Sequence, residues 1–126
     1  MTTWLEFFVV SVLLGILMEI LAHRLRLWIY TPPRMVVVNV LVTVGLLFGT
    51  LAWLAEGASL PIQFLCGALV GIAYEALNFA GLNAWTFPGS KLWFLKGRIA
   101  LMIGVGMAWG LYPVLTTLLI RLLERS

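Results

Sequence analysis

The sequence predicts an all-α integral membrane protein with four transmembrane helices. Hydrophobic residues make up 63% of the 126 positions and charged residues only 10%, whereas about a quarter of the residues in a soluble domain are charged. A helix needs about 20 mostly apolar residues to span the hydrocarbon core of a bilayer. Four runs of that kind are present and leave almost no residues for a soluble part. We therefore expect a single transmembrane domain over residues 1–126.

In chain order, the predicted spans cover residues 4–22, 35–55, 61–79 and 99–120. No basic region precedes the first span and no small-residue cleavage site follows it, so we expect it to be retained. The runs are too long and too continuously apolar for the alternating strands of a membrane barrel. Because backbone groups in lipid must pair inside a helix or a closed barrel, we expect four helices. Pro113 is expected to kink the fourth.

The basic residues predict the side of the membrane on which each loop lies. Loops 23–34 and 84–98 each contain three Lys or Arg residues, whereas loop 56–61 contains none. The positive-inside bias therefore places both basic loops in the cytoplasm and both termini outside a cell (inner) membrane. Arg121 and Arg125, near the C-terminus, weaken this preference.

Both basic loops also contain aromatic residues, which are typical of the lipid headgroup level. An ordinary aromatic belt would explain them, and a surface for lipid headgroups or a partner protein is the alternative. The net charge is only +3, and no basic run is long enough to indicate nucleic-acid binding. We expect membrane lipids as partners and no nucleic acid.

The chain contains signs of a duplicated helical hairpin. A shift of 56 residues lays the first predicted span on the third and defines repeats 1–57 and 58–126. The most telling matches are Gly15 with Gly71, Glu19 with Glu75, Pro32 with Pro88 and Trp53 with Trp109. Two hairpins in the same orientation are expected to be related by a pseudo-two-fold axis along the membrane normal.

Small residues lie one and two helical turns before each matched glutamate. These residues are Ser11 and Gly15 before Glu19, and Gly67 and Gly71 before Glu75. A four-residue spacing places each set on one helical face, and such faces let membrane helices approach closely. We expect spans one and three to pack through these faces and to bring the two carboxylates opposite each other. Two further packing motifs, within the bundle or between protomers, are Gly45–Gly49 and Gly106–Gly110.

Other polar residues fall at a similar depth and predict an inner cluster that binds a proton or an ion. Its six members are Glu19, His23, Asn39, Glu75, Asn78 and Arg98. Intramembrane ionisable residues are rare and mark functional sites or paired charges.

Three interpretations of this cluster stay open. In the first, the glutamates are structural braces. Arg98 then pairs with Glu75, while Arg24, Arg26 or a backbone donor binds Glu19. In the second, two neighbouring carboxylates in a low-dielectric setting share a proton and exchange it for a cation. In the third, Glu19, His23 and Glu75 bind iron, manganese or zinc, although their spacing matches no established ligand signature.

Several kinds of chemistry find no support in the sequence. The chain has no G-x-S-x-G motif, no Asp and no glycine-rich phosphate loop, so an enzyme is not favoured. Cys66 is expected to be a packing residue, and no cofactor is identified.

Two functions from different classes follow from these observations. The first is a small proton- or cation-coupled carrier or channel with a paired-glutamate site, acting as a homo-oligomer. The alternative is a non-catalytic four-helix subunit of a larger membrane complex. Such a subunit would dock through its GxxxG faces and Trp-rich cytoplasmic loops.

Overall fold

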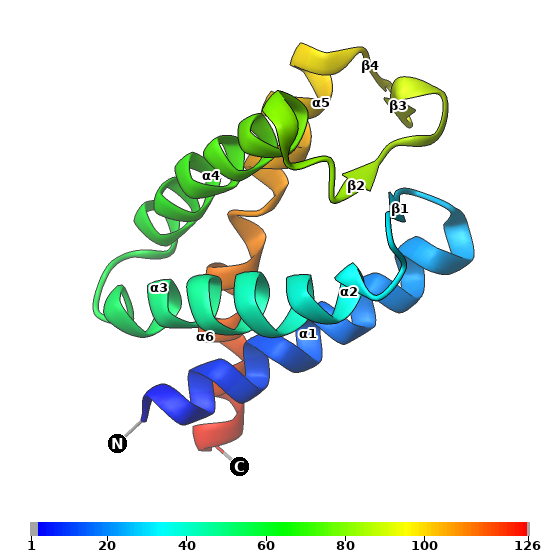
Figure 1. The fold of residues 1–126 in the computed structure, drawn as a ribbon. Coiled ribbons are helices and arrows are strands. Elements are labelled where there is room, and N and C mark those ends of the chain that lie inside the picture. Colours follow the sequence, from blue (N-terminus) through cyan, green and yellow to red (C-terminus); the bar gives the residue numbers. More distant parts are fainter. Residues whose placement is uncertain (1–2, 126) are drawn as a thin grey trace.

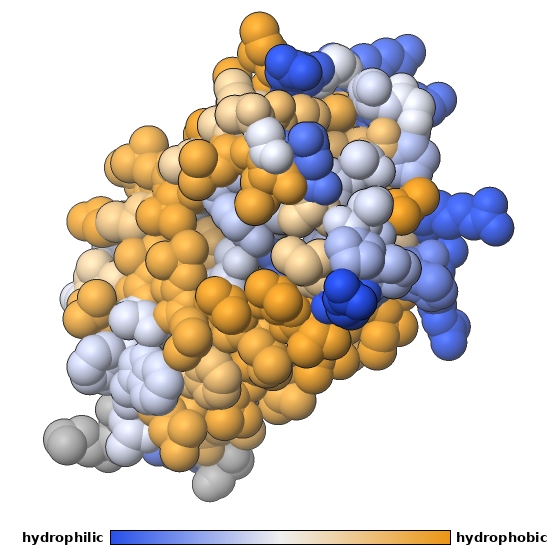
Figure 2. All heavy atoms as spheres, viewed as in Figure 1, coloured by the Kyte–Doolittle hydropathy of each residue, from blue (hydrophilic) through white to orange (hydrophobic). Residues whose placement is uncertain are grey.

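The computed structural model describes residues 3–125, which are predominantly helical (Figure 1). In this part of the chain, four helical stretches are long and apolar enough to cross a membrane: Trp4–Leu25, Met35–Leu54, Leu60–Leu82 and Arg98–Arg125. The prediction of four such helices is confirmed, and they suggest a multi-pass membrane protein. Apolar side chains cover most of the face seen in Figure 2, which fits helices surrounded by lipid rather than water.

The first helix, α1 (Trp4–Leu25), has a defined start and end. The Thr3 side chain accepts a hydrogen bond from the Glu6 N–H, which is the usual N-cap arrangement. Arg26 stops the helix in the left-handed conformation, with φ of 53°, and its N–H points back to the carbonyls of the last turn. The chain then turns into a two-residue strand, β1 (Ile29–Tyr30).

The second and third spans each contain a π-helical stretch. The second consists of α2 (Met35–Val38), η1 (Asn39–Phe48) and α3 (Gly49–Leu54). The third consists of α4 (Leu60–Leu77) and η2 (Asn78–Leu82). Both π-helical stretches begin at an asparagine, and π-helical geometry occurs frequently at functional sites.

The fourth span is interrupted, as the proline predicts. It consists of α5 (Arg98–Ala108) and α6 (Leu111–Arg125), and the break at residues 109–110 lies just before Pro113. Proline is tolerated in the first turn of a helix, where its missing N–H would have no partner, and it opposes continuation of the preceding helix. The break lets α6 lie against α1, α3 and α4, whereas α5 packs mainly on α4.

The two basic loops are joined by a short antiparallel ladder that the sequence analysis did not predict. Strand β1 pairs with β2 (Trp85–Thr86), so that Tyr30 lies opposite Trp85. A 3-10 turn, η3 (Pro88–Ser90), leads to a hairpin of β3 (Lys91–Leu92) and β4 (Leu95–Lys96). In Figure 1 all four strands lie at the end of the molecule opposite the two termini. The loop residues there contribute Ala84, Trp85, Phe87 and Leu92 to a buried cluster.

In the first hairpin, the small residues of α1 pack on the second span. A Cβ atom on Gly15 would lie 3.0 Å from the Val44 side chain, and one on Gly45 would lie 2.7 Å from Phe8. The Ser11 hydroxyl donates a 2.7 Å hydrogen bond to the Val44 carbonyl. Gly49 similarly approaches the backbone of α1.

In the second hairpin, the small residues of α4 pack on the fourth span. Gly67 approaches Gly110 and Pro113, and Gly71 lies against the carbonyl of Gly106. The expectation that spans one and three pack through these faces is therefore wrong, because each face is covered inside its own hairpin. The GxxxG motifs likewise pack within the bundle. The duplication itself stays a prediction.

Candidate functional site

The two glutamates are held by the same kind of donor. Trp28 Nε1 donates a 3.2 Å hydrogen bond to Glu19 Oε2, and Trp85 Nε1 donates bonds of 3.0 and 3.2 Å to the two oxygens of Glu75. In each case the tryptophan lies in the loop after the helix, nine residues beyond Glu19 and ten beyond Glu75. An indole N–H can satisfy a carboxylate without adding a charge.

Glu19 is half-buried and accepts two further hydrogen bonds. Tyr30 donates its hydroxyl to Oε1 at 2.6 Å, and Asn39 Nδ2 donates to the same oxygen at 3.2 Å. Burial, together with the neighbouring carboxylate, raises the pKa of the Tyr30 phenol above its ordinary value. Tyr30 therefore stays protonated and remains a donor to Glu19.

A polar bridge connects the first glutamate to the helix that carries the second. Tyr74 donates its hydroxyl to Asn39 Oδ1 at 3.0 Å and accepts a 2.7 Å hydrogen bond from Thr43. Asn39 and Thr43 lie in η1, whereas Tyr74 lies in α4, directly before Glu75. The bridge thus joins the two hairpins, and the network passes from Glu19 through Asn39 to Tyr74.

Glu75 is completely buried, with 0% of its surface exposed. Its hydrogen-bond donor Trp85 is fixed by Asn78, whose amide oxygen accepts the backbone N–H of Ala84 at 2.9 Å and that of Trp85 at 3.3 Å. Asn78 Nδ2 also donates to the Trp85 carbonyl at 2.9 Å. Asn78 therefore positions the loop and its indole instead of contacting Glu75 itself.

The aromatic rings around the two glutamates form a continuous cluster. The ring centroids of Trp85 and Tyr74 are 4.8 Å apart, and those of Trp85 and Tyr30 are 6.2 Å apart. Trp109 continues the cluster at 5.3 Å from both Tyr74 and Tyr112. Its Nε1 is buried without a hydrogen-bond partner among the described residues. The Trp109 indole lies beside the Glu75 carboxyl group and is a second polar neighbour of it.

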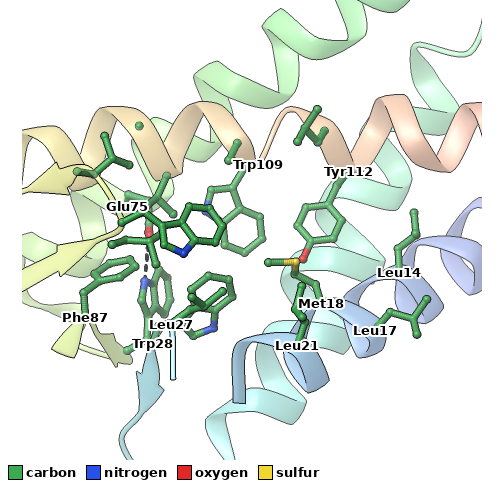
Figure 3. A pocket seen from close by; sticks show the side chains of 18 of the residues that line it. Leu14, Leu17, Met18, Leu21, Leu27, Trp28, Glu75, Phe87, Trp109 and Tyr112 are labelled. Carbon is green, nitrogen blue, oxygen red and sulfur yellow. Dashed lines mark hydrogen bonds between the residues drawn. The ribbon is translucent and has the colours of Figure 1, made fainter. Parts of the chain in front are cut away.

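An apolar cavity of about 490 Å³ lies next to Glu75, between α1, α5, α6 and the two loops. This volume falls within the range of small-molecule sites, about 300–1,000 Å³. Figure 3 shows Glu75 and Trp28 at one end and Tyr112 and Leu17 at the other. Among the residues that the structure describes, Glu75 is the only Asp, Glu, Lys, Arg or His that lines this cavity.

The structure assembles only part of the predicted polar cluster. Asn39 contacts Glu19 directly, and Glu75 joins through the neighbouring Tyr74 and Trp85. Within residues 3–125, the two carboxylates share no direct hydrogen bond, so the expected face-to-face pair is replaced by two linked sites.

The predicted basic members of the cluster lie at the surface. Arg98 is exposed, and its guanidinium carbon lies 5.9 Å from the centroid of the Phe79 ring. His23 is also exposed and lines a surface groove. Among the described residues, Glu19 and Glu75 accept their hydrogen bonds from uncharged donors. The expected pairing with arginine is therefore wrong, although bracing by neutral donors is present.

The metal interpretation is not supported by the geometry. Nowhere in residues 3–125 do three His, Cys, Asp or Glu side chains come close enough to hold a metal ion. Glu19, His23 and Glu75 are accordingly not a common set of ligands.

Several residues of the site were not among the predicted ones. They are Trp28, Tyr30, Thr43, Tyr74, Trp85 and Trp109. Tryptophan and tyrosine in such loops are also typical of a membrane-interface belt. Their presence alone therefore does not indicate that they donate hydrogen bonds to the glutamates. The similar spacing of nine and ten residues from each glutamate to the next indole donor is the signal that points to it.

Comparison of the chain with protein-family models, with curated proteins and with solved structures finds no match. Its function must therefore be inferred from the site itself.

Proposed function

We propose that the chain is a small multi-pass carrier of the inner membrane that exchanges a proton for an organic cation at Glu75. The observation that carries this proposal is a completely buried carboxyl group on the wall of an apolar cavity. In the described residues it has an indole as its partner and no cationic side chain. An ionised carboxylate is costly in such surroundings unless a cation pairs with it. Protonation or cation binding are the two ways to remove that cost.

The walls of the cavity favour an organic cation over a metal ion. Trp28, Trp85, Trp109, Tyr30 and Tyr112 line it, and aromatic faces attract ammonium groups through their quadrupoles. A metal ion needs several oxygen or nitrogen ligands, whereas Glu75 stands alone among apolar groups. The ligand class is therefore a lipophilic amine or quaternary ammonium ion.

The role proposed for Glu19 is support of the same cavity. Its carboxyl group is bound by Trp28 and Tyr30, which both line the cavity, and by Asn39. The Glu19 carboxyl group therefore holds two aromatic walls in place, while Glu75 takes the cation. In this proposal the two glutamates do not share a proton. Glu19 supports the aromatic walls, and Glu75 binds the cation.

The ladder between β1 and β2 supports a common side of the membrane for loops 23–34 and 84–98. The basic residues favour the cytoplasm for both, with the termini outside. A homo-oligomer remains part of the proposal, because a bundle of four candidate spans leaves little interior for an aqueous path.

The test is calorimetric binding of tetraphenylphosphonium to the detergent-purified protein at acidic and alkaline pH. We expect the wild type to bind more tightly at alkaline pH, where the carboxyl group is already ionised. At acidic pH, binding should release a proton, seen as a binding heat that depends on the buffer. Glu75→Gln should lose both effects, whereas Glu56→Gln, the same change at an exposed carboxyl group outside the cavity, should keep them. Equal binding by wild type and Glu75→Gln would refute the proposal. Proton-driven uptake into proteoliposomes then tests transport.

A non-catalytic subunit of a membrane complex is the second candidate. Its proposed GxxxG docking faces are covered within the chain, but the tip of the β3–β4 hairpin supports docking through a Trp-rich loop. Trp93 and Phe94 there are 67% and 85% exposed. A subunit of this kind should aggregate when purified alone, and a Trp93→Ala/Phe94→Ala variant should then become monodisperse. A monodisperse wild type would count against this candidate.

A further inference from the structure

A second hollow lies on another side of α1 from the Glu75 cavity. It is a groove of about 1220 Å³ between α1 and the α2–η1 segment. Its α1 wall includes Val12, Ile16 and Ile20, whereas Leu14, Leu17, Met18 and Leu21 face the first cavity. Its opposite wall includes Val37 and Leu41. The two hollows therefore lie on different sides of α1, and Trp28 and Tyr30 line both of them.

The polarity of this groove changes along its length. Apolar side chains form the walls over most of it, and three basic residues, His23, Arg24 and Arg26, lie at one end. Arg24 and Arg26 are exposed, and within residues 3–125 no carboxylate pairs with them. Figure 2 shows hydrophilic residues gathered at the end of the molecule where α1 meets β1, beside an apolar surface. An anionic head with an apolar tail has the complementary pattern.

The length of the groove matches one leaflet of a bilayer. Twelve residues separate Val12 from Arg24, which is about 18 Å along a helix. Half of the hydrocarbon thickness of a bilayer is about 15 Å. An acyl chain lying along Ile16 and Ile20 would thus place its head at the arginines.

We propose that this groove binds an anionic phospholipid, with the phosphate at Arg24 and Arg26 and one acyl chain between α1 and η1. Arginine suits this task because its planar fork can donate two hydrogen bonds to a phosphate. The proposal rests on membrane insertion of the chain but not on cation exchange at Glu75.

Glu19 also lines the groove and sets the depth of the head. It lies five residues before Arg24, about 7.5 Å deeper along the helix. Its oxygens act as acceptors and offer no hydrogen bond to a phosphate at that level, so the phosphate is confined to the arginine end. Both oxygens of Glu19 are already bound by side chains of this protein, which leaves the neighbouring apolar wall for the glycerol and acyl groups.

The experiment is native mass spectrometry of the detergent-purified protein titrated with dioleoyl phosphatidylglycerol or dioleoyl phosphatidylcholine. We expect a preference for phosphatidylglycerol in the wild type. The variant Arg24→Gln/Arg26→Asn should weaken its binding about 30-fold, from the contribution of two basic residues near an anionic lipid. Asparagine is chosen at position 26 because it tolerates the left-handed backbone there.

The matched control is Lys91→Gln/Lys96→Gln, which removes two positive charges from the β3–β4 hairpin, outside the groove. This variant should bind phosphatidylglycerol like the wild type. Equal loss in both double variants would mean general attraction to surface charge and would overturn the proposal. Equal binding of the two lipids by the wild type, or no retained lipid, would also overturn it. Glycerol 3-phosphate should not compete, and full competition would show a site for free phosphate instead of lipid.

Discussion

Removal of one hydroxyl group from Tyr74 tests whether the polar bridge holds the two hairpins together. In Tyr74→Phe the ring can keep its contacts with Trp85 and Trp109, but the hydrogen bonds to Asn39 and Thr43 are lost. Asn39 Oδ1 is then left without a donor in a buried position. A neutral hydrogen bond contributes about 0.5–1.5 kcal/mol, and bonds between membrane helices average about 0.6 kcal/mol. The expected loss of unfolding free energy is therefore about 1–2 kcal/mol for the two bonds together.

The assay is reversible unfolding of the detergent-solubilised protein in a denaturing detergent, followed by circular dichroism. Thr43→Val removes only the donor to Tyr74, so a cycle of Tyr74→Phe, Thr43→Val and the double variant isolates one bond. We expect a coupling energy of about 0.6 kcal/mol and at most about 1.7 kcal/mol. Phe94→Ala, a change in an exposed side chain, is the control for nonspecific loss. An unchanged stability in Tyr74→Phe, or additive single effects, would refute the bridge.

Three further substitutions test the packing and the loops by thermal unfolding. Gly71→Ala should lower the free energy of unfolding by about 1–3 kcal/mol, because its Cβ would meet the backbone of the opposite helix. Gly57→Ala is the control, because position 57 has open space around it. Equal melting temperatures of the two variants would contradict this packing. Asn78→Leu should lower the melting temperature and weaken tetraphenylphosphonium binding, because three hydrogen bonds that fix the indole donor are lost. Unchanged binding would show that the position of the Trp85 loop does not affect the cavity. Trp93→Ala/Phe94→Ala should change stability by less than about 0.5 kcal/mol because both side chains are exposed, and a larger loss would show that the hairpin tip is packed.

The helices were predictable because each depends on local information. Four apolar runs of sufficient length gave the candidate spans, and Pro113 gave the interruption of the fourth. The small residues correctly marked faces of close approach. They could not identify the partner helix, because a helix face made of glycine and serine can pack closely against the backbone of any neighbouring helix. The nearest neighbour in each hairpin occupies that face.

The site was only partly predictable because it depends on two loops that meet in space. Strands β1 and β2 are two residues long, too short for an alternating pattern to be visible in the sequence. Their pairing brings Tyr30 beside Trp85 and so creates the aromatic cluster. The partners of the glutamates were equally hidden, since charge alone favours arginine. In the structure, Arg98 stays exposed while uncharged donors reach the buried carboxyl groups.

The interrupted fourth span also affects the order in which the molecule can be assembled. Helix α6 contacts α1, α3 and α4, and its Ile120 shares a buried cluster with Phe7 and Ala52 of the first hairpin. Of the described helices, α6 is the last to leave the ribosome. The first hairpin and the α4–α5 pair can therefore form during synthesis, but the end opposite the β1–β2 ladder stays open until α6 arrives. Until then, the exposed seam between the hairpins is a place where a membrane chaperone could bind a partly made chain.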